Sequence, residues 1–208
     1  MLPRKHFTIV STLVSLTFAT SAALAADAQK VKVLDSCDKI DAKATVLSEV
    51  KAKVVPTTDT AHPKAIEITI DYAKPGTYPN FGRKFAPGML DPKKYSALRF
   101  FVRSNSGTSF SVQFHRGPRA DEKLNWFLGG VIEGKPEWTQ ITIPLENFKR
   151  GGGKIWKNGA QLVLPGGDPF DADDYANINE LKFVSTIDRR GSATVGHLMF
   201  DAIELVEK

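Results

Sequence analysis

The feature that most constrains the fold of this chain is an alternation of apolar and polar residues that recurs in short runs along most of its length. From Ile66 to Tyr72 every second residue is large and apolar, and the residues between them are polar. Successive side chains of a β-strand point to opposite faces, so this pattern predicts a strand with one buried face. About eight to ten such runs, separated by turn residues, predict an all-β antiparallel sandwich.

Two runs in the middle of the chain predict a β-hairpin with a buried face and an open face. The strands cover Leu98–Val102 and Phe110–Phe114, and the turn between them reads Ser-Asn-Ser-Gly at 104–107. The apolar residues at alternate positions are expected to enter the core. The intervening side chains then share the outer face of the hairpin: Arg99, Phe101, Arg103, Ser111, Gln113 and His115.

Further strands are expected on both sides of this hairpin, with one long interruption. The additional predicted strands cover Val31–Leu34, Ala44–Val55, Leu124–Ile132, Ile141–Leu145, Ile178–Thr186 and Val195–Val206. The Lys, Glu and Ala content of Ala44–Val55 leaves a helical turn as the alternative there. Leu124–Ile132 is either a strand pair or one strand with a bulge at Gly129-Gly130, and Pro144 predicts an edge position or a strand end. The segment Glu146–Asp174 is rich in Gly, Pro, Lys and Asp and is expected to be a long loop, a feature that is uncommon unless functional.

The N-terminus resembles an export signal. Arg4–His6 is a short basic head, Phe7–Phe18 is an apolar run, and Ala23–Ala25 fits a small-residue cleavage site. We therefore expect a signal peptide at 1–25, a single sandwich domain at 26–208, and a periplasmic or secreted location. The apolar run is shorter than the roughly 20 residues that span a bilayer, so a retained anchor helix is the weaker alternative.

Charge and cysteine content narrow the classes of function. The formal charge of +5 includes the leader cations Arg4 and Lys5, and subtracting these two leaves +3 for the mature chain. This weak charge, spread along the sequence, does not indicate nucleic acid binding. Cys37 has no second cysteine to pair with, so we expect a buried thiol; an intermolecular disulfide or a reactive thiol is the alternative.

The strand motifs resemble those of a known family. Tyr95–Val102, Ser111–Phe114, Trp138–Leu145 and Phe200–Leu205 are similar to the central and final strands of galactose-binding-like jelly-roll carbohydrate-binding modules, including those of the family-eleven type. The resemblance implies a jelly-roll sandwich that binds a polysaccharide or oligosaccharide without catalysis. Such modules are usually attached to a glycoside hydrolase.

Two groups of residues are candidates for holding a glycan. The outer face of the predicted hairpin combines Phe101 with polar groups, which suits a sugar because its hydroxyls need hydrogen bonds and its ring face stacks on aromatic carbon. The second group is a rim of loop aromatics, comprising Tyr78, Trp126 and Trp156, with Phe81 nearby. The alternatives are a solvated sheet face with one exposed or loop-covered Phe for the first group, and aromatic plugs over the core for the second.

The resemblance also implies a structural calcium ion between the first and last strands. The positions that fit are Asp35 and Asp201, which would need carbonyl and water oxygens to complete the shell of six to eight ligands. The alternative is that Asp201 caps backbone amides in a loop. The acidic residues Asp168, Asp171, Asp173 and Asp174 lack the spacing of an EF-hand and are expected in a solvated turn.

Catalytic motifs are lacking in the sequence. It has no Gly-x-Ser-x-Gly elbow and no phosphate-binding loop. Glu67 and Asp71 fall on one strand face about 13 Å apart, which exceeds the separation usual for glycoside hydrolysis. A non-catalytic module is therefore expected, with an envelope interaction or assembly protein and a glycoside-active enzyme on the same fold as alternatives.

Overall fold

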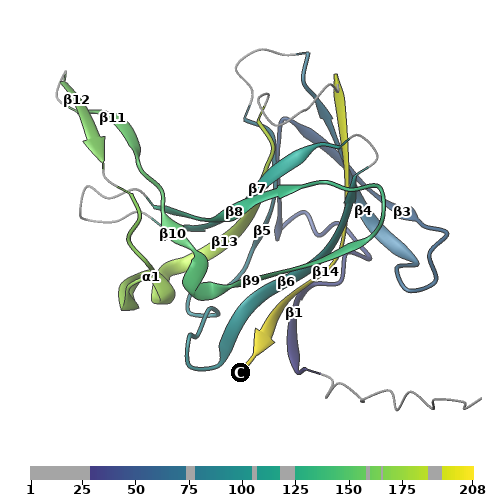
Figure 1. The fold of residues 1–208 in the computed structure, drawn as a ribbon, viewed down its shortest axis with the longest axis horizontal. Helices are drawn as coiled ribbons and strands as arrows, with labels where there is room; N and C mark the ends of the chain where they lie inside the picture. Colours follow the sequence, from purple (N-terminus) through teal and green to yellow (C-terminus); the bar gives the residue numbers. More distant parts are fainter. Residues whose placement is uncertain are drawn as a thin grey trace, which may run out of the picture.

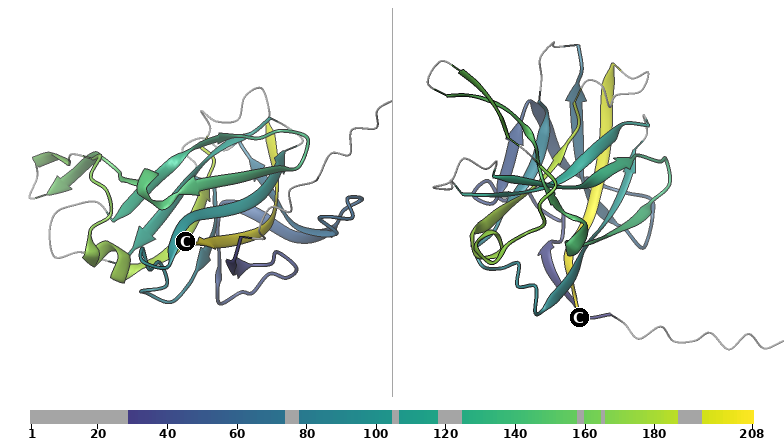
Figure 2. Two further views of the ribbon diagram at one scale, coloured as in Figure 1. Left: turned by 60° about the horizontal axis from the view of Figure 1, so that its bottom comes forward. Right: turned by 60° about the vertical axis from the view of Figure 1, so that its left-hand side comes forward.

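Two antiparallel sheets stack face to face in the computed structural model, which describes residues 29–73, 78–104, 107–117, 125–157, 160–164, 166–186 and 194–208 (Figure 1). Each sheet holds six strands of this described part, and a separate two-stranded hairpin projects from one end of the sandwich (Figure 2). The expected all-β jelly-roll sandwich is confirmed. The predicted leader at 1–25 and its cleavage site lie outside the described residues.

The first sheet, called sheet A, has the strand order β3-β4-β14-β6-β9, and β1 pairs with β14. Its strands are β1 (Val31–Asp35), β3 (Val50–Pro56), β4 (Lys64–Asp71), β6 (Tyr95–Ser104), β9 (Thr139–Pro144) and β14 (Val195–Glu207). β9 lies at one edge and ends at Pro144, as expected for a residue that lacks a backbone N–H.

The second sheet, called sheet B, has the order β10-β8-β7-β13-β5-β2. Its strands are β2 (Thr45–Ser48), β5 (Asn80–Lys84), β7 (Ser109–Arg116), β8 (Trp126–Glu133), β10 (Lys149–Arg150) and β13 (Ile178–Val184). The expected glycine bulge is present, because the register between β7 and β8 shifts between Val112 and Gln113, opposite Gly130 and Leu128. The sequence 44–55, predicted as one strand, instead divides at Glu49 (φ 57°) into β2 and β3 of different sheets.

Phenylalanine side chains fill the space between the sheets. Phe100 and Phe200 of sheet A contact Phe110 and Phe183 of sheet B, with ring centroids 4.5 to 6.3 Å apart. Such tilted and edge-to-face pairs add to the stabilisation from burial of the rings. The predicted inward set is confirmed, because each of its members is at most 2% exposed: Leu98, Phe100, Val102, Phe110, Val112 and Phe114.

The hairpin predicted between β6 and β7 is wrong. β6 pairs with β14 and β9 in sheet A, whereas β7 pairs with β8 and β13 in sheet B. The chain therefore passes from sheet A to sheet B between Ser104 and Ser109. Both strands still bury their apolar residues because the core lies between the layers, so alternation alone does not show whether consecutive strands pair or lie in different layers.

The segment predicted as a long loop contains regular structure. It includes the short 3-10 helix η1 (Leu145–Asn147), β10, the hairpin strands β11 (Gly153–Lys157) and β12 (Ala160–Leu164), and the helix α1 (Ala172–Asn177). Asp171 caps α1 by accepting from the Asp174 amide, and the Asp174 side chain accepts from the Asp171 amide. This reciprocal pair is a capping box, which explains why a helix of one and a half turns forms here.

The acidic residues of that segment are not all in a solvated turn as expected. Asp174 is fully buried, with its carboxylate 2.8 Å from Arg116 Nη1 and 2.6 Å from Arg150 Nη2. Arg150 also lies over the Phe127 ring, 4.6 Å from its centroid. A carboxylate between two buried guanidinium groups therefore fixes α1 against sheet B.

Cys37 lies inside the sandwich, as predicted. Its side chain is fully buried, and burial raises the pKa of the thiol well above its ordinary value, so the thiolate needed for reactivity is disfavoured. Within the described ranges, no helix has the length and apolarity required to cross a membrane.

Candidate functional site

The outer face of sheet B brings together four residues expected to contact a ligand: Tyr78, Gln113, His115 and Trp126. Gln113 and His115 lie on the same side of β7, and Trp126 lies opposite His115 on β8. Tyr78 precedes β5 and reaches across to Gln113, with its hydroxyl 3.2 Å from Oε1. We call this set the sheet B site.

A chain of hydrogen bonds fixes the polar side chains of the sheet B site. Gln113 Oε1 accepts from the Tyr78 hydroxyl and lies 3.0 Å from His115 Nε2, while Gln113 Nε2 donates to Ser111 Oγ at 3.0 Å. Gln113 is only 5% exposed, whereas Tyr78 is 47% exposed. Gln113 therefore positions the more exposed Tyr78 and His115, and these two groups are the ones that a ligand can reach.

His115 is an uncharged hydrogen-bonding group at neutral pH. Burial and the neighbouring ammonium of Lys182 lower its pKa from 6.5 to about 4. Because an amide oxygen only accepts, the contact with Gln113 places the proton on Nε2 and leaves Nδ1 as an acceptor. The site thus offers a neutral acceptor, a phenol and an indole, a combination that suits polyhydroxylated molecules with apolar ring faces.

The backbone next to Trp126 forms a glycine-rich cavity of about 510 Å³. Trp126 and Leu128 border it on β8, and glycines contribute much of the remaining wall: Gly129, Gly130, Gly151, Gly152, Gly166 and Gly167. A Cβ atom on Gly151 would lie 2.1 Å from the Trp126 ring, so the absence of a side chain allows the indole to lie against the backbone. The cavity extends the sheet B site toward β10.

Three other residues predicted to share this surface lie on the outer face of sheet A. Arg99 donates two hydrogen bonds to Glu204 Oε2, at 2.9 and 2.7 Å. Phe101 packs against His62, with ring centroids 4.5 Å apart, and the Arg103 guanidinium lies 5.8 Å from the Trp138 ring centroid. The single composite surface predicted from β6 and β7 is therefore wrong, because the two strands belong to different layers.

Residues preceding β4 cover part of the sheet A face. His62 is 8% exposed and lies between Phe101 and Trp138, whose ring centroid is 4.7 Å away. Its Nδ1 lies 2.8 Å from the carboxylate of Asp201. Phe101 is thus a covered aromatic residue, which was one of the alternatives left open by the sequence.

The remaining aromatic candidates differ in their surroundings. Phe81 is 1% exposed and belongs to the core. Trp156 lies on β11 opposite Gln161, but its side chain lies outside the described residues. Among the rim candidates whose side chains the structure describes, Tyr78 and Trp126 lie at the sheet B site.

The two carboxylates expected to bind calcium contact other side chains of the protein. Asp35 forms an ion pair with Arg83 and accepts from the Cys37 amide at 2.8 Å, while Asp201 is paired with His62. Burial raises the pKa of Asp35, although the Cys37 amide and Arg83 oppose this shift. Among the described residues, no three His, Cys, Asp or Glu side chains are grouped to hold a metal ion, and both carboxylates expected to bind calcium are engaged by groups of the protein itself.

Glu67 and Asp71 are occupied by other interactions. Glu67 lies 2.8 Å from Lys53 Nζ, and Asp71 accepts from the Ala73 amide at 3.0 Å. Neither borders the glycine-rich cavity. The geometry therefore gives this pair no support as the two carboxylates of a glycoside hydrolase.

Sequence reasoning missed Lys182, Glu180 and Gly151. Lys182 lies opposite Gln113 on the neighbouring β13, and its ammonium is 3.2 Å from Glu180. Glu180 and Lys182 alternate with buried residues in β13, and this pattern indicates that both side chains point outward. The pairing of β13 with β7, which places Lys182 beside Gln113, could not be predicted from this alternation. The role of Gly151 depends on a tertiary contact and leaves no local pattern.

Solved structures of carbohydrate-binding modules share this fold. A family 11 module of a cellulosomal cellulase from Clostridium thermocellum matches with a TM-score of 0.58 at 16% identity, covering 87% of this chain and 96% of that module. A family 30 carbohydrate-binding module also gives 0.58, at 12% identity, with 86% and 99% covered. No protein-family model and no curated protein matches the sequence.

An enzyme contains the same architecture as one part of a longer chain. An exo-β-agarase matches with a TM-score of 0.58 at 13% identity, covering 86% of this chain but 25% of that enzyme. The fold is therefore that of the jelly-roll carbohydrate-binding modules. The resemblance to family-eleven-type modules expected from the strand motifs is confirmed at the level of the fold.

Proposed function

We propose that this chain is an exported, non-catalytic carbohydrate-binding protein that holds a glycan on the outer face of sheet B. The observation that carries the proposal is the convergence of Tyr78, Gln113, His115 and Trp126 from three separate segments on one surface. Aromatic rings and neutral hydrogen-bonding groups are the two features needed to recognise a sugar. The jelly-roll fold is compatible with this role.

The glycine-rich cavity gives the glycan room beside Trp126. Gly151 lacks a side chain that would displace the indole, and a Cβ atom on Gly130 (φ 149°) would have no other atom within 4 Å. A flat sugar ring can therefore approach both the indole and the backbone. The proposed ligand path runs from Tyr78 across β7 to Trp126 and into this cavity.

Two polysaccharides are suitable first probes. One similar family 11 module was solved in complex with a β-1,3-1,4-mixed-linked tetrasaccharide, and two similar structures are agarases. We expect retarded migration of the protein in native gels that contain mixed-linked β-glucan or agarose. Trp126→Ala and Tyr78→Ala should each abolish most of the retardation, because each removes one stacking surface.

The matched control is Lys53→Ala on sheet A. The Lys53 side chain is 68% exposed and forms a surface ion pair with Glu67, so its loss should leave both folding and the glycan-dependent retardation unchanged. Equal migration of the wild-type protein in gels with and without glycan, across a panel of neutral and acidic polysaccharides, would reject the proposal. Release of new reducing ends would instead favour the glycoside-active alternative.

Export is proposed from the leader sequence. The expected mature N-terminus is Ala26, and the expected location is the periplasm or the medium. Mass spectrometry of the protein purified from cell fractions tests both statements. An intact Met1 in the extracytoplasmic fraction would contradict cleavage at this position.

A further inference from the structure

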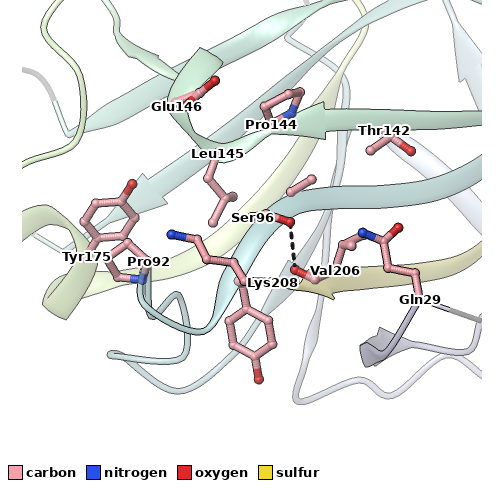
Figure 3. Close-up of a pocket in the computed structure, with 12 residues that line it drawn as sticks. Gln29, Pro92, Ser96, Thr142, Pro144, Leu145, Glu146, Tyr175, Val206 and Lys208 are labelled. Atoms are coloured by element: carbon pink, nitrogen blue, oxygen red, sulfur yellow. Dashed lines mark hydrogen bonds between the residues drawn. The ribbon is translucent and has the colours of Figure 1, made fainter. Parts of the chain in front are cut away.

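A second cavity, of about 390 Å³, lies at the end of sheet A where β6 begins and β9 ends. Its floor is made of the small residues Ser96 and Ala97, and its lining includes two tyrosines and two prolines: Tyr95, Tyr175, Pro92 and Pro144. Figure 3 shows Tyr175 and Pro92 on one side of the cavity, with Leu145 and Pro144 along another. We call this cavity the sheet A pocket.

Contacts with other residues of the protein fix the side chains that line the sheet A pocket. The Tyr175 ring packs edge-on against Phe170, with centroids 4.9 Å apart, and Lys94 Nζ lies 5.2 Å from the Tyr95 ring centroid. The Ser96 hydroxyl donates to the Val206 carbonyl at 3.4 Å, which keeps its oxygen lone pairs available to a ligand (Figure 3). The pocket is therefore formed before any ligand arrives.

The chemistry of the lining favours an uncharged polyol. The side chains of Glu146 and Lys208 contribute one charge of each sign, so the lining side chains do not form a site of a single charge. Ser96 and Thr142 add hydroxyl groups, and the tyrosines and prolines add flat apolar surfaces. Burial and the Glu146 carboxylate raise the pKa of Tyr175, which keeps its phenol protonated and able to donate.

We propose that the sheet A pocket is a second glycan site, which takes a single neutral sugar unit. The inference rests on the proposed function, because it assigns the same ligand class to a separate surface of the molecule. The volume lies at the lower end of the range of small-molecule pockets, which suits one ring and not a long chain. Two sites on different sheets make the protein bivalent toward a polysaccharide.

An extended peptide fits this pocket less well than a sugar. Peptides commonly bind by adding a strand to an exposed sheet edge. The part of β6 that forms the floor is already paired on both sides, with Val206 opposite Ala97 in β14 and Pro144 opposite Ala97 in β9. A peptide would therefore find no free backbone partner at the floor of the pocket.

The four tyrosines of the chain provide separate reporters for the two sites. Tyr78 reports on the sheet B site, Tyr95 and Tyr175 report on the sheet A pocket, and the core residue Tyr72, 1% exposed, serves as an internal reference. The experiment is a ¹⁹F NMR titration of full-length mature protein labelled with 3-fluorotyrosine. Each resonance is assigned by a Tyr→Phe variant.

The probes are glucose, galactose, the β-1,3-1,4-mixed-linked tetrasaccharide and, as a peptide control, tetraproline. We expect at least one saccharide to shift the Tyr95 and Tyr175 resonances without moving that of Tyr72. Thr142→Trp, at an exposed position in the edge strand β9, should fill the pocket and abolish those shifts while the Tyr78 response persists. The same variant should weaken retention on the polysaccharide by about tenfold, because bivalent attachment is lost.

The outcomes separate the two proposals. If saccharides move Tyr78 alone, the sheet B site stands and the sheet A pocket is rejected as a glycan site. If they move Tyr95 and Tyr175 alone, the second site stands and the proposed location of the first one fails. Shifts of Tyr95 and Tyr175 with tetraproline alone, or saccharide shifts that survive Thr142→Trp, would overturn the inference.

Discussion

His115 Nε2 lies 3.0 Å from Gln113 Oε1, two positions apart on the same outward side of β7. This contact couples the orientation of the imidazole to the amide that also receives the Tyr78 hydroxyl. Since the Gln113 side chain is almost fully buried, it fixes the geometry of both neighbours. The sheet B site is therefore preorganised by a residue that a ligand scarcely contacts, and preorganisation lowers the entropic penalty of binding.

The buried imidazole predicts a specific dependence of stability on pH. Its pKa is about 4 in the folded protein against 6.5 for an ordinary histidine, so the unfolded chain binds the extra proton first as the pH falls. The free energy of unfolding should therefore be fully retained above about pH 6.5 and decrease toward pH 4, by up to about 3 kcal/mol. Urea denaturation at about pH 7 and about pH 4.5 measures this difference.

The control for this experiment is His115→Gln, which keeps a hydrogen-bonding side chain but does not titrate. Because all carboxylates are the same in both proteins, the difference between their pH profiles isolates the imidazole. The variant should lose less stability than the wild type over this interval. Parallel profiles would contradict the lowered pKa of His115.

Two adjacent aspartates give a matched test of buried and exposed ion pairs. Asp173 and Asp174 lie 2.7 and 2.8 Å from the same Arg116 Nη1, but their side chains are 60% and 0% exposed. Asp174→Asn removes the one fully buried carboxylate that Arg116 and Arg150 share, and leaves them with the more exposed carboxylates of Asp173 and Asp171. This change should lower the free energy of unfolding by about 3 kcal/mol. Asp173→Asn should lower it by less than about 1 kcal/mol.

Thermal or urea denaturation of the two variants checks this difference. Circular dichroism at neutral pH shows whether each variant retains the sheet structure before it is denatured. Equal losses of stability in the two variants would mean that the carboxylate of Asp174 does not anchor α1 in the way described above.

The sequence predicted which face of each strand is buried better than it predicted which strands pair with one another. The inward residues of β6 and β7, from Leu98 to Phe114, were identified because burial on one face imposes a period of two. The same period holds whether consecutive strands pair or cross between layers, so Arg99 and Gln113 were assigned to one surface although they occupy opposite sheets. Strand pairing is decided by long-range contacts that local alternation does not encode.

The prediction of site residues was limited in the same way, because local sequence does not encode long-range contacts. Tyr78 and Trp126 were recognised as candidates because large aromatic residues in turn-rich sequence are good ligand contacts, but their convergence with Gln113 depends on the order β8-β7-β13-β5. Asp174 was expected in solvent because its partners, Arg116 and Arg150, are distant in the sequence. The sheet A pocket combines the start of β6, the end of β9 and α1, so no contiguous motif predicts it.

The close approach of Gly151 to Trp126 predicts a loss of glycan binding without direct contact with the ligand. In Gly151→Ala, the new methyl group would lie within 2.1 Å of the indole and force the ring to move. Retardation in glycan gels should fall nearly as far as in Trp126→Ala. Gly117→Ala is the matched control, because no atom lies within 4 Å of its Cβ position; equal effects of the two alanines would contradict this account.

The side-chain partners of Asp35 and Asp201 predict how the protein responds to calcium. A calcium ion would have to displace Arg83 from Asp35 and His62 from Asp201 before gaining either carboxylate, and both of these side chains are themselves buried. Removing calcium with a chelator, or adding it in millimolar excess, should therefore leave Tm unchanged, because a ligand raises Tm only when it binds the folded state. A rise in Tm with calcium that Asp35→Asn abolishes would instead support the site implied by the sequence resemblance, and would require Arg83 to adopt a different partner in the calcium-bound protein.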